Sequence, residues 1–239
     1  MGLSLTVLGA SGSYPGPGSA CSGYLVRSSS TTVWLDAGSG TLANLQRHVA
    51  IGDVDAIVLT HEHPDHWTDL LGYYIATKYY MPRDAVPVYA PESLRDHAYY
   101  HDAPLDWRVV TDADTVEIGD LRLTFSRTDH PPETLATRVD GDGRSIVYTA
   151  DTGPGWEPAR FGRGVDLLLS EATFLASGDD VPHHLSADIA GRFARDAAAQ
   201  RLVVTHLQPG LDREACRAEA HASYGRDVVV ATENEEYHL

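Results

Sequence analysis

The chain carries a dense group of potential metal ligands in the segment His61-Glu-His-Pro-Asp-His66. Neutral imidazoles and carboxylates are the usual nitrogen and oxygen ligands of zinc and related cations. The segment differs from the helical H-E-x-x-H zinc motif, because Asp65 stands where that motif has its second histidine. The alternative is a polar loop that is rich in histidine by chance, in a chain with 12 histidines. The order of ligands after a buried strand favours a metal site.

Two expected elements position this cluster. The apolar, branched run Asp55–Thr60 predicts a buried strand. The stretch Trp67–Met81 has the length of a helix and contains only Gly72 as a weak helix former. The ligands therefore lie in the loop at the carboxyl end of a strand, where open α/β sheets place their functional sites.

Four further polar residues follow predicted strands along the chain. The residues are His130 after Leu121–Ser126, Asp151 after Ser145–Thr149, Glu171 after Val165–Leu169, and His206 after Leu202–Thr205. Each alone is a weak signal, because histidines and acids are common in loops. Together with the His61–His66 cluster they are enough to hold two metal ions that share a carboxylate.

The pattern His61-x-His-x-Asp-His66 after a strand ending in Thr60 resembles the signature of the metallo-β-lactamase superfamily. The resemblance implies an α/β fold, a four-layer αββα sandwich of two face-to-face sheets with helices outside. It also implies two divalent cations, zinc first with manganese as the alternative. His63 stands where the oxygen-reducing branch of the superfamily tends to carry Glu, which favours a hydrolase. The implied ligands are His61, His63 and His130 for the first metal, Asp65, His66 and His206 for the second, and Asp151 as the bridge.

A narrower resemblance concerns the segment His184-Leu-Ser-Ala187 and the Glu171-Ala-Thr-Phe174 segment before it. Both are similar to the phosphodiesterase branch, which includes ribonuclease Z and cyclic-nucleotide phosphodiesterases. The likeness implies that His184 is not a ligand but stabilises the transition state or protonates the leaving oxygen. It implies that Glu171 orients this imidazole, because a carboxylate beside a histidine can fix the tautomer of its ring. Asp65 is expected to hold or receive the nucleophile's proton.

The charge of the chain argues against a polyanionic substrate. The formal net charge is −16, and Lys78 is the only lysine. Such a surface repels phosphate backbones and gains little from counterion release. The chain also lacks the long basic arm with which ribonuclease Z grips tRNA, so it resembles small, armless relatives. Nucleic acid is therefore not expected as a partner.

The organisation of the chain predicts a single domain over residues 1–239. Short strands and helices alternate, without a linker, a repeat or a low-complexity block. No apolar run reaches membrane-span length, and the amino terminus reads as a strand rather than a signal peptide. Cys21 and Cys216 form no ligand pattern and suit a reducing cytoplasm, where we expect the protein.

The function expected from these observations is hydrolysis of a cyclic nucleotide or another small phosphodiester through a metal-bridging hydroxide. Alternatives are ribonuclease Z-type processing of tRNA 3′ ends, thioester or lactone hydrolysis, and a non-catalytic module that keeps its metals to bind a ligand. Trp67, Tyr73 or Tyr74 near the cleft could hold a base, although core positions are more common for such residues. The sequence does not determine the oligomeric state, and a homodimer is one of the alternatives.

Overall fold

The fold, taken from a computed structural model that describes residues 2–178 and 182–239, contains two seven-stranded sheets. The first has the order β14-β1-β2-β3-β4-β5-β6 and the second the order β13-β12-β11-β10-β9-β8-β7. The strands of the first sheet are β1 (Ser4–Gly9), β2 (Gly23–Arg27), β3 (Thr32–Ala37), β4 (Ala56–Val58), β5 (Val86–Ala90), β6 (Leu105–Val109) and β14 (Glu236–His238). Those of the second are β7 (Thr115–Ile118), β8 (Leu121–Arg127), β9 (Leu135–Gly141), β10 (Arg144–Tyr148), β11 (Leu167–Glu171), β12 (Arg201–Thr205) and β13 (Val228–Val230).

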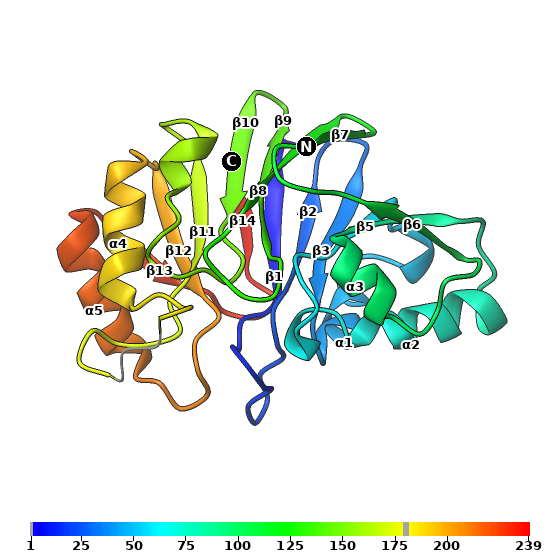
Figure 1. Cartoon of the computed structure of the whole chain (residues 1–239), viewed down its shortest axis with the longest axis horizontal. Coiled ribbons are helices and arrows are strands. Elements are labelled where there is room, and N and C mark those ends of the chain that lie inside the picture. The colour runs from blue at the N-terminus through cyan, green and yellow to red at the C-terminus, as the bar shows by residue number, and fades with distance from the viewer. Residues whose placement is uncertain (1, 179–181) are drawn as a thin grey trace.

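Helices cover the outer face of each sheet (Figure 1). Those on the first sheet are α1 (Thr41–Leu45), α2 (Asp69–Ile75), which continues into a π-helical turn η3 (Ala76–Tyr80), and α3 (Glu92–His97). Those on the second sheet are α4 (Ala187–Asp196) and α5 (Arg213–Tyr224). Three short 3₁₀ turns complete the described elements: η1 (Ile51–Asp53), η2 (Pro64–His66) and η4 (Pro158–Phe161).

Three apolar layers hold the sheets and helices together. Successive residues of a strand point to opposite faces, so Val33 and Leu35 pack between the two sheets while Trp34 packs under the helices of the first sheet. In the second sheet, Ile146 faces the layer between the sheets and Val147 faces the layer under α4 and α5. This double burial explains the continuous apolar runs in the sequence. The expected four-layer αββα sandwich is confirmed.

The two outer helices of the second sheet pack closely. A Cβ atom added at Gly191 of α4 would lie 2.3 Å from the backbone oxygen of Ala220 in α5. The absent side chain therefore allows the two helices to approach one another. Asp212 caps the amino end of α5 by accepting hydrogen bonds from the backbone N–H groups of Glu214 and Ala215. The α4 helix begins three residues after His184, so this packing also fixes the position of the His184 segment.

Several predicted elements differ from the observed ones at the edges of the sheets. The pattern of residues in Pro104–Ala113 predicts an irregular segment, but it contains β6, which pairs in parallel with β5. This edge strand is half exposed and carries charged residues, which hides its pattern. The apolar run Val228–Ala231 is the last strand that the sequence predicts, but β14 follows it and pairs with β1. The β11 strand includes Ser170 and Glu171, so Glu171 lies in the strand rather than after it.

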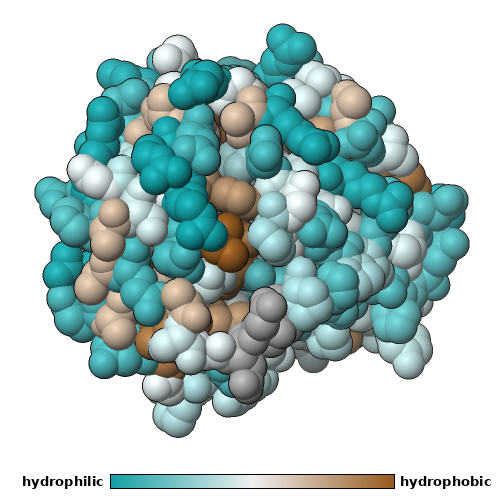
Figure 2. Space-filling model, turned by 60° about the vertical axis from the view of Figure 1, so that its left-hand side comes forward, coloured by the Kyte–Doolittle hydropathy of each residue, from teal (hydrophilic) through white to brown (hydrophobic). Residues whose placement is uncertain are grey.

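The surface is mainly hydrophilic on the face that Figure 2 shows, with a small hydrophobic area at its hollowed centre. This agrees with the acidic composition of the chain. Within residues 2–178 and 182–239, no helix combines the length and the apolar character that crossing a membrane requires.

Candidate metal centre

The candidate ligands converge because the loops after four strands meet at one edge of the sandwich. The loop after β4 carries His61, His63, Asp65 and His66, and the segments after β8, β10 and β12 carry His130, Asp151 and His206. All of these side chains are buried except that of His63, which is half-buried. Ala150 and His206 have positive φ angles of 52° and 55°, which are uncommon for residues with a side chain. The backbone thus turns sharply where β10 and β12 deliver their ligands.

A first group consists of His61, His63, His130 and Asp151. One potential ligand atom from each of the four lies within 4.8 Å of the others. The Nδ1 atom of His63 lies 3.2 Å from Nε2 of His130, and Nε2 of His61 lies 3.6 Å from Oδ2 of Asp151. Three imidazoles and one carboxylate at this spacing match the donor set that divalent zinc prefers.

A second group consists of Asp65, His66 and His206, whose ligand atoms also lie within 4.8 Å of one another. The Oδ2 atom of Asp65 is 3.2 Å from Nε2 of His206 and 3.5 Å from Nε2 of His66. One oxygen and two nitrogens therefore face a common point beside the first group.

Asp151 lies between the two groups, and its two oxygens face opposite ways. The Oδ2 atom is 3.6 Å from His61 Nε2 and 3.9 Å from His130 Nε2, on the side of the first group. The Oδ1 atom is 3.3 Å from His66 Nε2 and 3.4 Å from His206 Nε2, on the side of the second. A carboxylate that serves two neighbouring cations requires this arrangement.

Three buried polar atoms support cation binding at this place. Within the described part of the chain, Nε2 of His61, Nε2 of His66 and Oδ1 of Asp151 have no hydrogen-bond partner. Buried polar atoms without partners are destabilising and rare. All three belong to the candidate ligands and face the space between them, so the residues present fit a pair of divalent cations.

The other ring nitrogens of the candidate ligands are hydrogen-bonded to the protein. The Nδ1 atom of His66 lies 2.8 Å from Oδ2 of Asp36, that of His206 lies 2.8 Å from Oγ1 of Thr173, and that of His130 lies 2.8 Å from the backbone oxygen of His183. An acceptor at Nδ1 keeps the proton there and directs the Nε2 lone pair to the metal. The fold thus favours, in these three histidines, the tautomer that metal binding through Nε2 requires.

Asp36 is a further residue of the site, to which the sequence assigned no role. Its carboxylate is fully buried and accepts hydrogen bonds from the backbone N–H and the hydroxyl of Thr60 and from the hydroxyl of Tyr148. It therefore ties the strand before the histidine cluster to His66. The signal was an acid at the end of a predicted strand, in the segment Asp36-Ala-Gly-Ser-Gly, the same signal that pointed to Asp151.

The electrostatics of the site keep its carboxylates charged. Burial opposes the charged form of Asp151, but the neighbouring His206 and His66 outweigh it and hold the pKa of this carboxyl well below its usual range. Burial likewise opposes ionisation of Asp65, and His66 and His206 lower its pKa. Burial lowers the pKa of His61, His63 and His130, which favours the neutral imidazoles that a metal needs.

His184 lies beside the two groups and is held by Glu171. Its Nδ1 atom is 3.1 Å from Oε1 of Glu171 and 3.9 Å from Oδ2 of Asp151. Burial opposes a charge on this imidazole, but the hydrogen bond and charge of Glu171 raise its pKa to about 9. His184 also lies close enough to Asp151 and His206 to form a third group of potential ligands.

The Glu171 carboxylate is itself fixed by several donors. Its Oε1 atom accepts from the backbone N–H of Thr152 at 2.7 Å, and its Oε2 atom accepts from the Leu185 N–H at 3.0 Å and the Thr173 hydroxyl at 2.7 Å. The Thr173 hydroxyl also accepts from His206. Glu171 thus links the His184 segment to the second group through Thr173.

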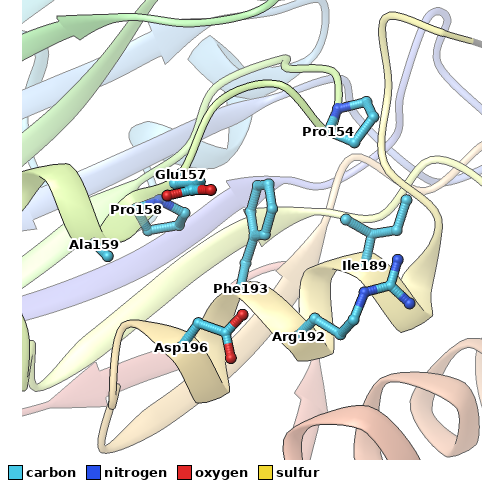
Figure 3. A pocket seen from close by; sticks show the side chains of 8 residues that line it. All are labelled: Pro154, Glu157, Pro158, Ala159, Ile189, Arg192, Phe193 and Asp196. Carbon is cyan, nitrogen blue, oxygen red and sulfur yellow. The ribbon is translucent and has the colours of Figure 1, made fainter.

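A separate hollow of about 200 Å³ lies between α4 and the 154–159 segment (Figure 3). It is lined in part by Ile189 and Phe193 and by the charged side chains of Glu157, Arg192 and Asp196. None of its lining residues belongs to the groups described above. The chemistry of the metal centre is therefore not located in this hollow.

Comparison with known proteins finds a matching family model and relatives that align with most of this chain. A family model described as the beta-lactamase superfamily domain matches residues 31–207. An uncharacterized protein of Mycobacterium leprae is 34% identical over 98% of this chain and 88% of its own length. A ribonuclease Z of Methanopyrus kandleri is 29% identical over 91% of each chain.

A solved structure confirms the fold. The probable metallo-hydrolase YhfI of Bacillus subtilis is 29% identical over 96% of this chain and 97% of its own. The crystal structure of YhfI, described as a metallo-beta-lactamase fold protein, superposes with a TM-score of 0.92 and 27% identity over 100% of both chains. The fold expected from the His61–His66 signature is the one observed.

Proposed function

We infer that this chain, which belongs to the beta-lactamase superfamily, is a metallo-hydrolase, and we propose that it hydrolyses small phosphodiesters with two divalent cations, zinc or manganese. The observation that carries the proposal is the position of Asp151, whose two oxygens face two separate groups of ligands. The similarity to YhfI, a probable metallo-hydrolase, supports the hydrolase part of the proposal. His61, His63 and His130 would hold one cation, Asp65, His66 and His206 the other, and Asp151 both.

The chemistry follows from these groups. Bound divalent cations would lower the pKa of water in the cleft and offset negative charge on a phosphoryl oxygen. His184, oriented by Glu171 through Nδ1, keeps Nε2 available to hold a proton for the leaving oxygen. The raised pKa of His184 favours the protonated form that this role needs. Asp65, whose Oδ2 faces His206 and His66, would hold or receive the proton of the nucleophile.

The substrate we propose is a cyclic nucleotide or another small phosphodiester. A net charge of −16 and a single lysine disfavour a long polyanion, whereas one phosphodiester charge can be offset inside a metal-loaded cleft. The second candidate is tRNA 3′ processing, which the 29% identity to a ribonuclease Z favours. Thioester or lactone hydrolysis and ligand binding without turnover are rivals from other classes.

A panel of substrates on one metal-replete preparation separates these functions. The panel contains bis(p-nitrophenyl) phosphate, cyclic mononucleotides, a precursor tRNA and a thioester. We expect hydrolysis of the first two, with a higher kcat/KM for cyclic nucleotides than for tRNA. Efficient cleavage at the tRNA 3′ end with inert cyclic nucleotides would favour the ribonuclease, and inert phosphodiesters with an active thioester would refute the proposal.

A further inference from the structure

The aromatic residues that the sequence suggested for holding a base are buried in the core. Trp67, Tyr73 and Tyr74 expose 4%, 0% and 3% of their surface. They belong to the apolar layer between the first sheet and its helices, Tyr73 and Tyr74 from α2 itself, and the Trp67 indole donates a hydrogen bond to the backbone oxygen of Glu62. They have the structural role that is more common for such residues. A nucleobase-like planar group of a substrate would therefore have to stack on a different side chain.

A loop between β1 and β2 lies directly against the second group of ligands. The backbone N–H of Ser13 donates to Oδ2 of Asp65 at 2.7 Å, the same oxygen that faces His206 and His66. A Cβ atom at Gly12 would lie 2.6 Å from Nδ1 of His206. The backbone of this loop is thus a wall of the metal centre.

The conformation of this loop is fixed. The Tyr14 N–H donates to the Gly12 oxygen at 2.8 Å around Ser13, whose φ is 65°. Three-residue turns with a positive φ are uncommon and strained, and such strain gathers at functional sites. The loop is anchored by a hydrogen bond from Gly12 N–H to the Leu207 oxygen and by a 2.6 Å contact between the hydroxyls of Ser11 and Ser19. In Figure 1 this dark-blue segment projects beyond the sandwich, between its two halves.

Tyr14 stands on this wall with its side chain in solvent. It is 52% exposed, and no hydrogen bond or aromatic contact of its side chain occurs within residues 2–178 and 182–239. Tyr14 directly follows Ser13, whose backbone N–H contacts Asp65, so its Cα atom is about 3.8 Å from that of Ser13. Phe174 is the other partly exposed aromatic residue nearby, but its ring packs edge-on against His184 at 6.1 Å. Tyr14 is therefore an exposed aromatic side chain next to a residue that contacts the metal centre.

We propose that Tyr14 is a specificity-determining residue that stacks on a planar, nucleobase-like group of the substrate. The inference rests on the proposed function, because the phosphodiester bound at the metals would bring that group to the ring. The loop carries no charged residue between Ala10 and Cys21, so it adds no repulsion to an anionic substrate.

The test compares two ligands that differ only by the base. Adenosine 5′-monophosphate and ribose 5-phosphate are titrated calorimetrically into the zinc-loaded protein. We expect the wild type to bind the nucleotide more tightly than the sugar phosphate. Tyr14→Ala should weaken nucleotide binding roughly tenfold and leave sugar phosphate binding unchanged, as expected for loss of one base–aromatic stack. Tyr14→Phe should retain the wild-type difference, and Tyr80→Ala, which removes a 78% exposed ring elsewhere, should change nothing.

Three results would overturn the inference. They are equal binding of both ligands by the wild type, an equal loss for both ligands in Tyr14→Ala, and a loss of zinc from that variant. The readout is binding, so it is independent of turnover. If the wild type hydrolysed no phosphodiester but Tyr14→Ala lost only nucleotide binding, the proposed activity would fail while the role of Tyr14 would stand.

Discussion

The Nδ1 atom of His66 lies 2.8 Å from Oδ2 of Asp36, and both side chains are completely buried. The same carboxylate binds the backbone and hydroxyl of Thr60 and the hydroxyl of Tyr148. Tyr148 ends β10, the strand of the second sheet that leads to Asp151. Asp36 therefore connects ligands delivered by both sheets, and it sets the orientation of one of them.

Asp36→Ala should lower the affinity of the second cation about 10- to 100-fold, because His66 loses the acceptor that fixes its tautomer. The affinities are measured by titrating the metal-free protein with zinc. Asp84→Ala is the matched control, because Asp84 is exposed. Unchanged binding of both cations in Asp36→Ala would show that His66 needs no such partner.

His184→Ala should retain both cations and lose rate by roughly 10²- to 10⁴-fold, the usual contribution of general acid–base catalysis. Elemental analysis and kcat with bis(p-nitrophenyl) phosphate are measured on the same preparation. Loss of a cation would identify His184 as a ligand, which its closeness to Asp151 and His206 permits. Turnover at the wild-type rate would leave it with a structural role only.

Gly191→Ala should destabilise the fold by about 1–3 kcal/mol, because the new methyl group would overlap the backbone of α5 at Ala220. Thermal unfolding of the metal-free protein measures the effect. Gly52→Ala is the control, since a Cβ atom there meets nothing within 4 Å. A melting temperature for Gly191→Ala equal to that of the control would contradict the close packing of α4 on α5.

The places of the candidate ligands in the chain were predictable, because they follow strands whose apolar runs are strong local signals. Their assignment as ligands comes from the family resemblance and stays a prediction, although the structure brings them together. The strands expected at Leu121–Ser126 and Leu202–Thr205 lie within one residue of β8 and β12 for the same reason, since strand periodicity is visible in the chain itself. The β6 and β14 strands were not predictable from such patterns. Both lie at edges of the first sheet, and each forms by pairing with another segment, β6 with β5 and β14 with β1. The local sequence of a strand does not indicate which other strand it pairs with.

The supporting residues were less predictable than the ligands. Asp36 and Thr173 act through single hydrogen bonds to His66 and His206, and such contacts follow from the packing of two sheets. The wall formed by Gly12 and Ser13 depends on the approach of β1 to the loop after β12, which no periodicity describes. The turn residues of Ala10–Ser19 predict only a tight loop whose backbone comes near the rim of the site, and the contact of Ser13 with Asp65 agrees with this.

The central claim is that Asp151 serves two cations at once, and the metal content of Asp151→Ala tests it most directly. The wild type, Asp151→Ala and the exposed-site control Asp84→Ala are loaded with zinc, dialysed and analysed for bound metal. We expect close to two ions per chain in the wild type and the control, and weakened binding at both sites in Asp151→Ala, because each group loses an oxygen ligand. Retention of one ion at full occupancy in Asp151→Ala would contradict the account, because Asp151 would then belong to a single site.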